Sequence, residues 1–239
     1  MCVKFLNFGY SELSEQTFIH HVTQEGDVML DVGAYVGAYC LPMAVLGAEV
    51  HAFEPARYSR QILMDNVHAN GLQEQITIYD MAVGSASSRA ALTTGYASGN
   101  RIAEDVSGLT ETDLVEVTTL DEWASGKNLE NLFLIKIDAE GMDEQVILGA
   151  QHVLRSFQPA LIVEYSNGTQ SLERLLQARG YNSYTYDLRS HCLVHFHAPS
   201  GWGNIIACTA AQHQAIHARL ASRSAPKLRR PLLQWAPSK

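Results

Sequence analysis

A glycine-containing turn constrains the fold of this chain more than any other feature. It lies in the run Met29-Leu30-Asp31-Val32-Gly33-Ala34-Tyr35-Val36-Gly37, and Glu54 follows a second apolar run. Val28–Val32 has the composition of a short buried strand, and glycines where the chain turns sharply into a helix let backbone amides approach a ligand without interference from Cβ atoms. An acidic residue about 20 positions beyond such a turn is placed to bind ribose hydroxyls. The pattern therefore predicts a site for an adenosine-containing ligand.

The details of the loop narrow the choice of ligand. The loop reads Asp31-x-Gly33-x-x-x-Gly37, whereas a dinucleotide-binding turn reads G-x-G-x-x-G and places a pyrophosphate at a helix N-terminus. A carboxylate at the start of the loop repels a pyrophosphate. It suits instead an ammonium or a neighbouring sulfonium, as in S-adenosylmethionine. The alternative is that Asp31 caps the turn and the glycines only relieve backbone strain.

Composition bounds the class of protein. A chain of 239 residues with 46% apolar and 18% charged residues favours one domain, which we place at residues 1–221 with a cofactor-binding core at about 25–210. The net charge of −8 argues against general affinity for nucleic acid or anionic membranes. Four cysteines without C-x-x-C or metal spacing predict reduced thiols in a cytoplasmic protein. Neither a signal peptide nor a membrane span is expected.

The last residues differ in composition from the rest. Residues 222–239 contain five basic residues, three prolines and no acidic residue. This composition predicts a flexible basic tail, and the alternative is a docking arm for an acidic partner.

Apolar runs alternate with helix-like segments from residue 26 to about 180, which is the pattern of a βαβ fold. Strands are expected at Val28–Val32, Glu49–Phe53, Gln75–Tyr79, Leu132–Asp138 and Ala160–Tyr165. Helices are expected at Val36–Leu46, Tyr58–Asn70, Asp121–Ala124, Glu144–Ser156 and Ser171–Arg179. Pro42 is tolerable only near the first turn of a helix, so the first helix is expected to start late or to bend.

Two segments interrupt this alternation. Tyr184–Leu188 and Asn204–Thr209 are separated by a loop rather than a helix, which predicts an antiparallel pair added to an otherwise parallel sheet. Gly84–Asp113 is rich in Ser, Thr, Gly and Ala and is expected to form a loop or small hairpin, too polar for core, over the sheet end. Because ligands bind outside the carboxyl ends of strands in open α/β folds, this segment is the candidate substrate cover. Little of the acceptor pocket is expected from the N-terminal side.

A second group of charged residues lies in Leu134-Ile135-Lys136-Ile137-Asp138-Ala139-Glu140-Gly141. Lys136, Asp138 and possibly Glu140 share one face of the expected strand, because alternate residues point to the same side. A buried lysine requires a nearby carboxylate, which could also come from Glu164. The group is either a functional site or a structural ion cluster, and its density of ionisable residues favours function.

Short motifs occur in a specific order along the chain. They are Asp31-Val-Gly-Ala-x-Val-Gly37, Ala52-Phe-Glu-Pro55, Asn66-x-x-x-Asn70-Gly71, Ala82-Val-Gly84, Thr119-Leu-Asp121, Lys136-Ile-Asp-Ala-Glu-Gly141, Leu148-Gly-Ala150 and Val163-Glu164. In order and spacing they resemble the FkbM family of S-adenosylmethionine-dependent methyltransferases over about residues 25 to 210. The resemblance implies an α/β class I methyltransferase fold. Such a fold has a Rossmann-like, mostly parallel seven-stranded sheet with an antiparallel C-terminal strand, and helices on both faces.

The resemblance also implies a cofactor, a reaction and site residues. The cofactor would be S-adenosylmethionine, and the reaction most often O-methylation of a hydroxyl on a small molecule such as a natural product, sugar or glycolipid. The cofactor-binding residues would be Asp31, Gly33, Ala34, Tyr35, Gly37, Glu54, Pro55, Asp80, Met81, Ala82 and Asp138. Asp138 or Glu140 would act as base or substrate orienter, and Lys136 would hold their geometry. No metal site is assigned, and the oligomeric state is not predicted.

The chain departs from the family pattern at two places. Tyr35 stands where the family commonly has Asn, and Met142-Asp143 replaces a small residue followed by Glu. Tyr35 supports the alternative of a catalytically idle cofactor-binding module. A nicotinamide-dependent oxidoreductase is a further alternative, against which the missing G-x-G-x-x-G and the early Asp31 count.

Other candidate residues rest on location alone. His191, His195 and His197 form an H-x-x-x-H-x-H pattern that could bind a metal or reach the cofactor cleft. Asp138, Glu140 and Glu164 could hold a divalent cation that acidifies the substrate. The acceptor pocket is expected from Gly84–Asp113 and Ser190–Gly203, with candidates Tyr96, Asn100, Arg101, Trp202 and Asn204.

Overall fold

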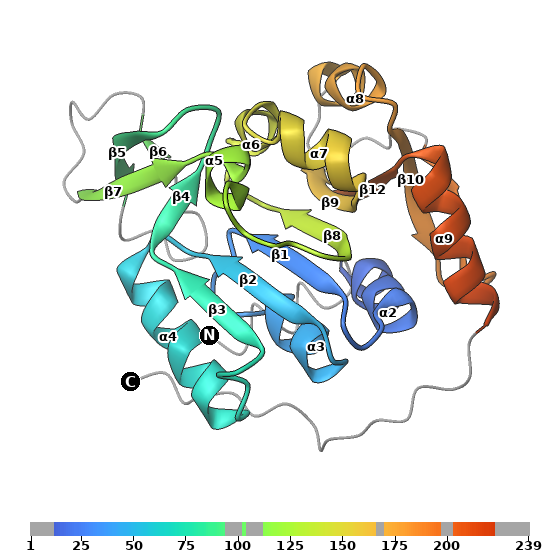
Figure 1. Ribbon diagram of the computed structural model, residues 1–239, viewed down its shortest axis with the longest axis horizontal. Helices are drawn as coiled ribbons and strands as arrows, with labels where there is room; N and C mark the ends of the chain where they lie inside the picture. Colours follow the sequence, from blue (N-terminus) through green and yellow to red (C-terminus); the bar gives the residue numbers. More distant parts are fainter. Residues whose placement is uncertain (1–11, 94–101, 104–111, 166–169, 197–202, 223–239) are drawn as a thin grey trace.

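The strands of the central sheet lie where the apolar runs predict them (Figure 1). The computed structural model describes residues 12–93, 102–103, 112–165, 170–196 and 203–222. Its parallel strands are β1 (Val28–Val32), β2 (Glu49–Phe53), β3 (Ile76–Tyr79), β8 (Leu132–Ile137) and β9 (Ala160–Tyr165). Three of the five match the expected bounds at both ends. These runs are rich in Val, Ile and Leu because strands covered by helices on both sides are buried on both faces.

The main sheet has eight strands in the described residues, in the order β11-β10-β12-β9-β8-β1-β2-β3. β12 (Gly203–Cys208) is antiparallel to both of its neighbours, β9 and β10 (Asn182–Asp187). The antiparallel strand is thus confirmed, but it is inserted between two strands and does not lie at the edge. The expected number of seven is exceeded by one, because β11 (Cys192–His195) folds back on β10 as an additional antiparallel edge strand.

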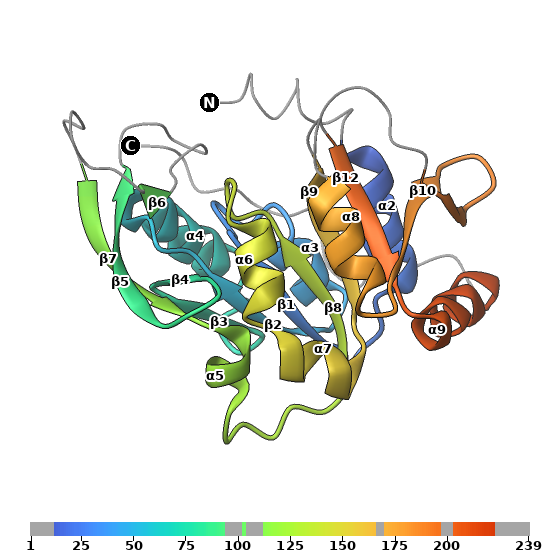
Figure 2. The same cartoon turned by 90° about the horizontal axis from the view of Figure 1, so that it is seen from above.

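Helices cover both faces of the sheet, as expected (Figure 2). One face packs against α2 (Leu13–Val22), α3 (Cys40–Val45), α4 (Arg57–Ala69) and α9 (Ala210–Ala221). The other packs against α5 (Leu120–Ala124), α6 (Asp143–Leu148), α7 (Gln151–Phe157) and α8 (Gln170–Gln177). Alternate residues along each strand pack into the cores on opposite faces of the sheet. Met29 and Leu134 face α3, whereas Leu30 and Ile135 face the opposite layer.

The helices differ from the sequence-based expectation in three ways. α3 starts late, at Cys40, so Pro42 lies in its first turn, where proline is tolerated. The helix expected at Glu144–Ser156 is interrupted at Gly149 and divides into α6 and α7. A Cβ on Gly149 would lie 2.0 Å from the carbonyl oxygen of Gly84, so this break lets two backbones pack together. α2 and α9 have no counterpart among the expected elements, because α2 has few large apolar residues and α9 is mostly alanine and polar residues.

A second sheet replaces the loop or small hairpin expected at Gly84–Asp113. It comprises β4 (Met81–Val83), β5 (Ser88–Thr93), β6 (Ile102–Ala103) and β7 (Thr112–Thr118), in the order β4-β7-β5-β6. The expectation that this segment is too polar for core was wrong, because Leu92 packs with Val115 and Val117 in a small core of its own. Tyr96, Asn100, Arg101, His197, Trp202 and the basic tail beyond Ser222 lie outside the described residues.

Candidate active site

Charged residues gather at the carboxyl ends of the central strands. Asp31 on β1 lies beside Lys136 on β8, since the two are register partners in the parallel ladder. Both point to the face that packs against α3, because they alternate with residues of the opposite core. Glu164, two residues after Ile162 on β9, points to the same side. The topology thus brings together residues that are about a hundred positions apart in the sequence.

The glycine loop connects β1 to α3, and its two glycines are also required by packing within the protein. Gly33 has φ +78°, and a Cβ there would lie 1.9 Å from the carbonyl oxygen of Asp138. A Cβ on Gly37, at φ +100°, would lie within 3 Å of Leu41 and Leu63. These Cβ positions would clash with protein atoms, so packing within the protein requires glycine at both positions. The expected approach of a ligand to the loop amides stays a prediction. The amides of Gly33 and Ala34 both donate to the carbonyl oxygen of Phe53.

Asp31 is 1% exposed, and its Oδ2 accepts a hydrogen bond from the amide of Cys40 at 2.9 Å. The carboxylate therefore does bond to the backbone at the start of α3, which is the capping role considered as an alternative. Burial raises the pKa of Asp31 to about 6, and the nearby ammonium of Lys136 limits that rise. The hydrogen bonds from the amide and the thiol of Cys40 leave further acceptor capacity on this carboxylate, so capping does not prevent it from binding a cation.

Lys136 is the centre of the charged group. Its side chain is 2% exposed, and its Nζ lies 3.0 Å from Oδ2 of Asp138. Burial alone lowers the pKa of a lysine, but here the carboxylates of Asp138 and Asp31 outweigh it and raise the pKa, so Lys136 remains a cation. The side chain of Asp138 is 33% exposed. Asp138 therefore connects the buried cation to the open side of the site.

Three further residues of this group belong to none of the sequence motifs. Tyr39 lies between the loop and α3, and Lys136 Nζ is 4.8 Å from the centroid of its ring. Glu12 and Glu15, at the start of α2, interact electrostatically with Lys136. The N-terminal side thus contributes charges near Lys136. No local motif indicates this, because α2 reaches the site only through packing against the sheet. The expectation that the N-terminal side adds little to the acceptor pocket stays a prediction.

Glu54 lies just beyond β2 and is 6% exposed. Its two carboxylate oxygens accept hydrogen bonds from the amides of Tyr35 and Ala56, each at 2.8 Å. Burial raises the pKa of Glu54 to about 7, against the opposing effect of these two hydrogen bonds. Each oxygen can accept a second hydrogen bond, so ribose hydroxyls could still bind there.

A pocket of about 310 Å³ lies beside Glu54, between the start of α4 and β7. Pro55 and Asp80 from the expected cofactor residues line it, together with Arg57, Arg60, Asp113, Leu114, Val115 and Glu116. Met81 is half-buried and Ala82 is buried, both in β4 directly after Asp80. The second sheet thus forms one wall of the pocket.

Further carboxylates surround Asp138. Glu140 is exposed, with φ +47°, and Asp143 accepts a hydrogen bond from the amide of Ala139. Burial and the charges of Asp138, Asp143 and Glu140 raise the pKa of Glu164 to about 8. Asn204, the register partner of Glu164 on β12, has a buried Oδ1 without a hydrogen-bond partner in the described residues. Among the acceptor candidates named by location, Asn204 is therefore beside the site.

The described histidines of the H-x-x-x-H-x-H pattern lie at the far edge of the sheet. His191 bonds to the hydroxyl of Tyr186, and His195 packs on the ring of Tyr184 at 4.9 Å. The described part of the chain contains no group of three or more His, Cys, Asp or Glu residues that could hold a metal ion.

The residues of this site lie within a part of the chain that matches a protein-family model. The family model described as "Methyltransferase FkbM domain" matches residues 31–183, which include the loop, Glu54, Lys136 and Glu164. The chain belongs to the FkbM methyltransferase family. Members of this family use S-adenosylmethionine, which is therefore the cofactor to be fitted to the site.

Solved structures share the fold of this FkbM family member. An FkbM methyltransferase from Methylobacillus flagellatus has a TM-score of 0.53 at 16% identity, over 81% of this chain and 50% of that one. A putative rRNA methylase from Clostridium thermocellum also has a TM-score of 0.53, at 10% identity, over 83% of this chain and 94% of that one. At these identities the similarity shows the fold alone.

One curated relative matches part of the chain. It is a tRNA(Phe) (4-demethylwyosine(37)-C(7)) aminocarboxypropyltransferase from Pyrococcus horikoshii, 29% identical over 75 residues. The match covers 31% of this chain and 27% of the relative. In the described residues of this FkbM family member, no helix is both long and apolar enough to cross a membrane.

The residues at the sheet end fit S-adenosylmethionine. The buried Tyr39 Oη has no hydrogen-bond partner in the part of the chain that the structure describes, and it lies in a group that holds both a cation and carboxylates. A ligand with an ammonium and a carboxylate matches such a group. Glu54 retains acceptor capacity for the ribose, and the pocket at Asp80 adjoins it.

Proposed function

We propose that this chain transfers a methyl group from S-adenosylmethionine to a hydroxyl of a small molecule, such as a natural product, sugar or glycolipid. The observation that carries the proposal is the group of Asp31, Lys136 and Asp138 at the carboxyl ends of β1 and β8, together with its opening to solvent at Asp138. This is the end of an open α/β sheet at which ligands bind.

We assign the cofactor to the carboxyl ends of β1 and β2, from the glycine loop to the pocket at Asp80. Asp31 would face the ammonium, and Glu54 the ribose hydroxyls, while Gly33, Ala34, Tyr35 and Gly37 shape the loop. Pro55, Asp80, Met81 and Ala82 would line the adenine end, as the pocket beside Pro55 and Asp80 supports. When bound, the cofactor supplies a methyl group on a positively charged sulfur. The protein then has to align the acceptor oxygen and exclude water.

A hydroxyl acceptor must also lose its proton. Asp138 is the first candidate to accept it, because its carboxylate is partly exposed and is held by Lys136 at 3.0 Å. Glu140 is the second candidate, since its side chain is exposed on the loop that follows β8. Glu164 faces the same region, and its raised pKa leaves it largely protonated near pH 7. In that state Glu164 could donate a hydrogen bond to the acceptor.

The choice of a small molecule over nucleic acid as the acceptor rests on charge. The net charge of −8 and the carboxylates around Asp138 disfavour a polyanion at this end of the sheet. Two of the similar proteins carry tRNA or rRNA in their names, so nucleic acid belongs in the test. Incubation with labelled methyl donor, a panel of hydroxylated metabolites, tRNA and rRNA distinguishes these acceptors. Label transferred only to RNA would overturn the small-molecule proposal.

The cofactor assignment is tested separately by calorimetric titration with S-adenosylhomocysteine and with NADH. We expect the first to bind and the second not to bind. Uptake of NADH alone, or of neither, would contradict the proposed function.

Asp138→Asn tests the role of the proposed base. The amide keeps the shape of the side chain but cannot accept a proton, so turnover should fall by about 10²- to 10⁴-fold. The affinity for S-adenosylhomocysteine, measured by calorimetry, should stay within a few-fold. Asp65→Asn, an exposed carboxylate on α4, is the control and should leave both quantities unchanged. Wild-type turnover in the Asp138 variant would remove this residue from the role.

A further inference from the structure

The hydroxyl of Tyr39 lacks a partner in the part of the chain that the structure describes. Tyr39 is 5% exposed, and its Oη is buried without a hydrogen bond. A buried hydroxyl without a partner costs free energy, so such groups usually bind water, protein or a ligand. Phenylalanine would fill the same space without this cost. The hydroxyl therefore points to a partner other than the residues that the structure describes.

The surroundings of Tyr39 define the chemistry of that partner. Lys136 lies over its ring with Nζ 4.8 Å from the centroid. Burial and the carboxylates of Glu12, Glu15, Asp138 and Asp31 raise the pKa of Tyr39 well above its usual value. The hydroxyl therefore remains protonated and acts as a donor. A buried cation and an O–H donor lie together, with carboxylates around them.

Among ligands, one of mixed charge fits this arrangement best. A simple anion could bind Lys136 and Tyr39 but would be repelled by the surrounding carboxylates. A simple cation could bind the carboxylates but would leave the Tyr39 hydroxyl without an acceptor. An α-amino acid carries an ammonium and a carboxylate a few ångströms apart. It can therefore place its carboxylate at Tyr39 and its ammonium at Asp31.

We propose that Tyr39, beside Lys136, binds the α-carboxylate of the amino-acid portion of the cofactor, while Asp31 faces its α-ammonium. This inference rests on the proposed function and extends it to a residue outside the family motifs. It makes Tyr39 a determinant of cofactor specificity. The hydroxyl selects ligands with an intact amino-acid portion over adenosine thioethers that lack one.

Calorimetric titrations with S-adenosylhomocysteine and 5′-methylthioadenosine test this role, because the second ligand has no amino-acid portion. Tyr39→Phe should weaken S-adenosylhomocysteine binding about 10-fold, as expected for one hydrogen bond to a charged group. It should leave 5′-methylthioadenosine binding unchanged. The matched control is Tyr181→Phe, in the opposite core next to the amino end of β10. It removes another buried hydroxyl that has no hydrogen-bond partner among the described residues. That control should change neither affinity.

A third ligand distinguishes a direct contact of Tyr39 with the cofactor from a change in the fold. An S-adenosylhomocysteine analogue without the α-carboxylate should bind the wild type about 10-fold or more weakly than the parent compound. In Tyr39→Phe this difference should shrink, because the hydrogen bond is already lost. Unchanged S-adenosylhomocysteine affinity in Tyr39→Phe, or an equal loss for both ligands of the first experiment, would overturn the inference. Absence of S-adenosylhomocysteine binding to the wild type would instead overturn the proposed function on which it rests.

Discussion

At the scale of single residues, Gly33 shows how a motif that resembles a ligand-binding turn is required by the fold itself. Its φ of +78° disfavours any side chain, and its Cα faces the backbone of Asp138 across the sheet. The same contact holds the start of the loop against the end of β8, where Lys136 and Asp138 lie. The residue therefore links the glycine loop to the charged group through packing.

Gly33→Ala should destabilise the protein strongly. Its Cβ would lie 1.9 Å from a backbone oxygen, so the loop or β8 must move in addition to the cost of the positive φ. We expect a loss of more than about 3 kcal/mol in the free energy of unfolding, measured with urea. Gly26→Ala is the matched control, because Gly26 has φ +85° with open space around its Cβ position. It should lose only about 1–2 kcal/mol, and equal losses would contradict the packing argument.

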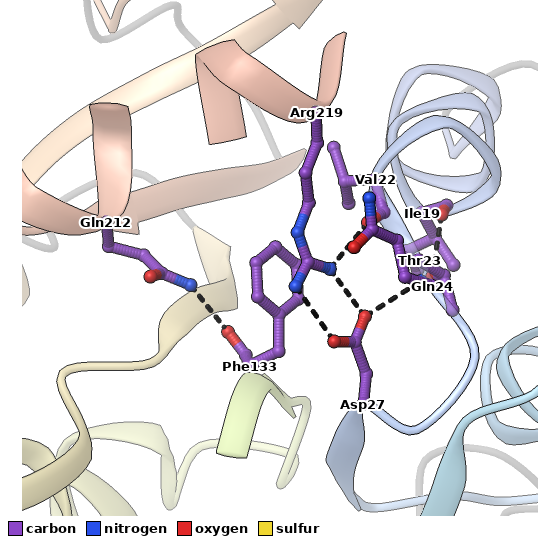
Figure 3. A network of polar contacts seen from close by, with 8 residues as sticks. All are labelled: Ile19, Val22, Thr23, Gln24, Asp27, Phe133, Gln212 and Arg219. Atoms are coloured by element: carbon purple, nitrogen blue, oxygen red, sulfur yellow. Dashed lines mark hydrogen bonds and ion pairs between the residues drawn. The ribbon is translucent and has the colours of Figure 1, made fainter. Parts of the chain in front are cut away.

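At the scale of elements, α9 is held to the sheet mainly by polar contacts, because its only fully buried apolar residue is Ile216. Figure 3 shows Arg219 reaching from α9 to Asp27, with both carboxylate oxygens bonded at 2.5 and 2.9 Å. The guanidinium also lies 3.7 Å from the centroid of the Phe133 ring. Gln212 adds a hydrogen bond to the carbonyl oxygen of Phe133 (Figure 3).

Arg219→Ala should therefore loosen α9. Asp27 is 4% exposed and would lose its cationic partner, so we expect a loss of about 2–3 kcal/mol in the free energy of unfolding. Chemical denaturation measures it, and hydrogen exchange of α9 amides localises it. Arg89→Ala, which breaks an exposed ion pair with Glu116, should cost less than about 1 kcal/mol. Similar costs in both variants would show that α9 does not depend on this contact.

At the scale of the whole molecule, the site concentrates carboxyl groups that burial holds partly protonated. The pKa values of Asp31, Glu54 and Glu164 rise to about 6, 7 and 8. Each group binds its proton more tightly in the folded chain than in the unfolded chain. Its contribution to stability is therefore fully present below the unfolded pKa, near 4, and is lost as the pH rises through the folded value.

The thermal midpoint of the ligand-free protein should accordingly fall as the pH rises from 5 to 8. Circular dichroism measures this midpoint. Glu164→Gln removes one of these titrations, so the thermal midpoint of this variant should depend less on pH. Relative to the wild type, the variant should therefore be more stable at pH 8 than at pH 5. Glu74→Gln, at an exposed position, should leave the slope unchanged. A midpoint that is constant or rises over this range would contradict the proposed protonation of the buried carboxyls.

The sequence predicted the parallel core well, because the buried strands are continuous apolar runs and the glycine turn has a local pattern. It also predicted Lys136 and Asp138 as part of a charged group, since alternation along one strand determines which side chains share a face. The register of β1 and β8 in the structure adds Asp31 to this group. The sequence did not predict β11, the second sheet or the two helices α2 and α9. These elements are stabilised by pairing and packing with distant residues, which local composition does not encode.

What the sequence determined by itself was the family, the cofactor class and the strands that carry the charges. Only the tertiary structure decided that Glu12, Glu15 and Tyr39 complete the charged group, that Glu54 is held by two backbone amides, and that packing requires Gly33 and Gly37. The reason is physical. Periodicity reports which face a residue occupies, whereas burial, hydrogen bonding and pKa depend on groups that the fold brings from elsewhere in the chain.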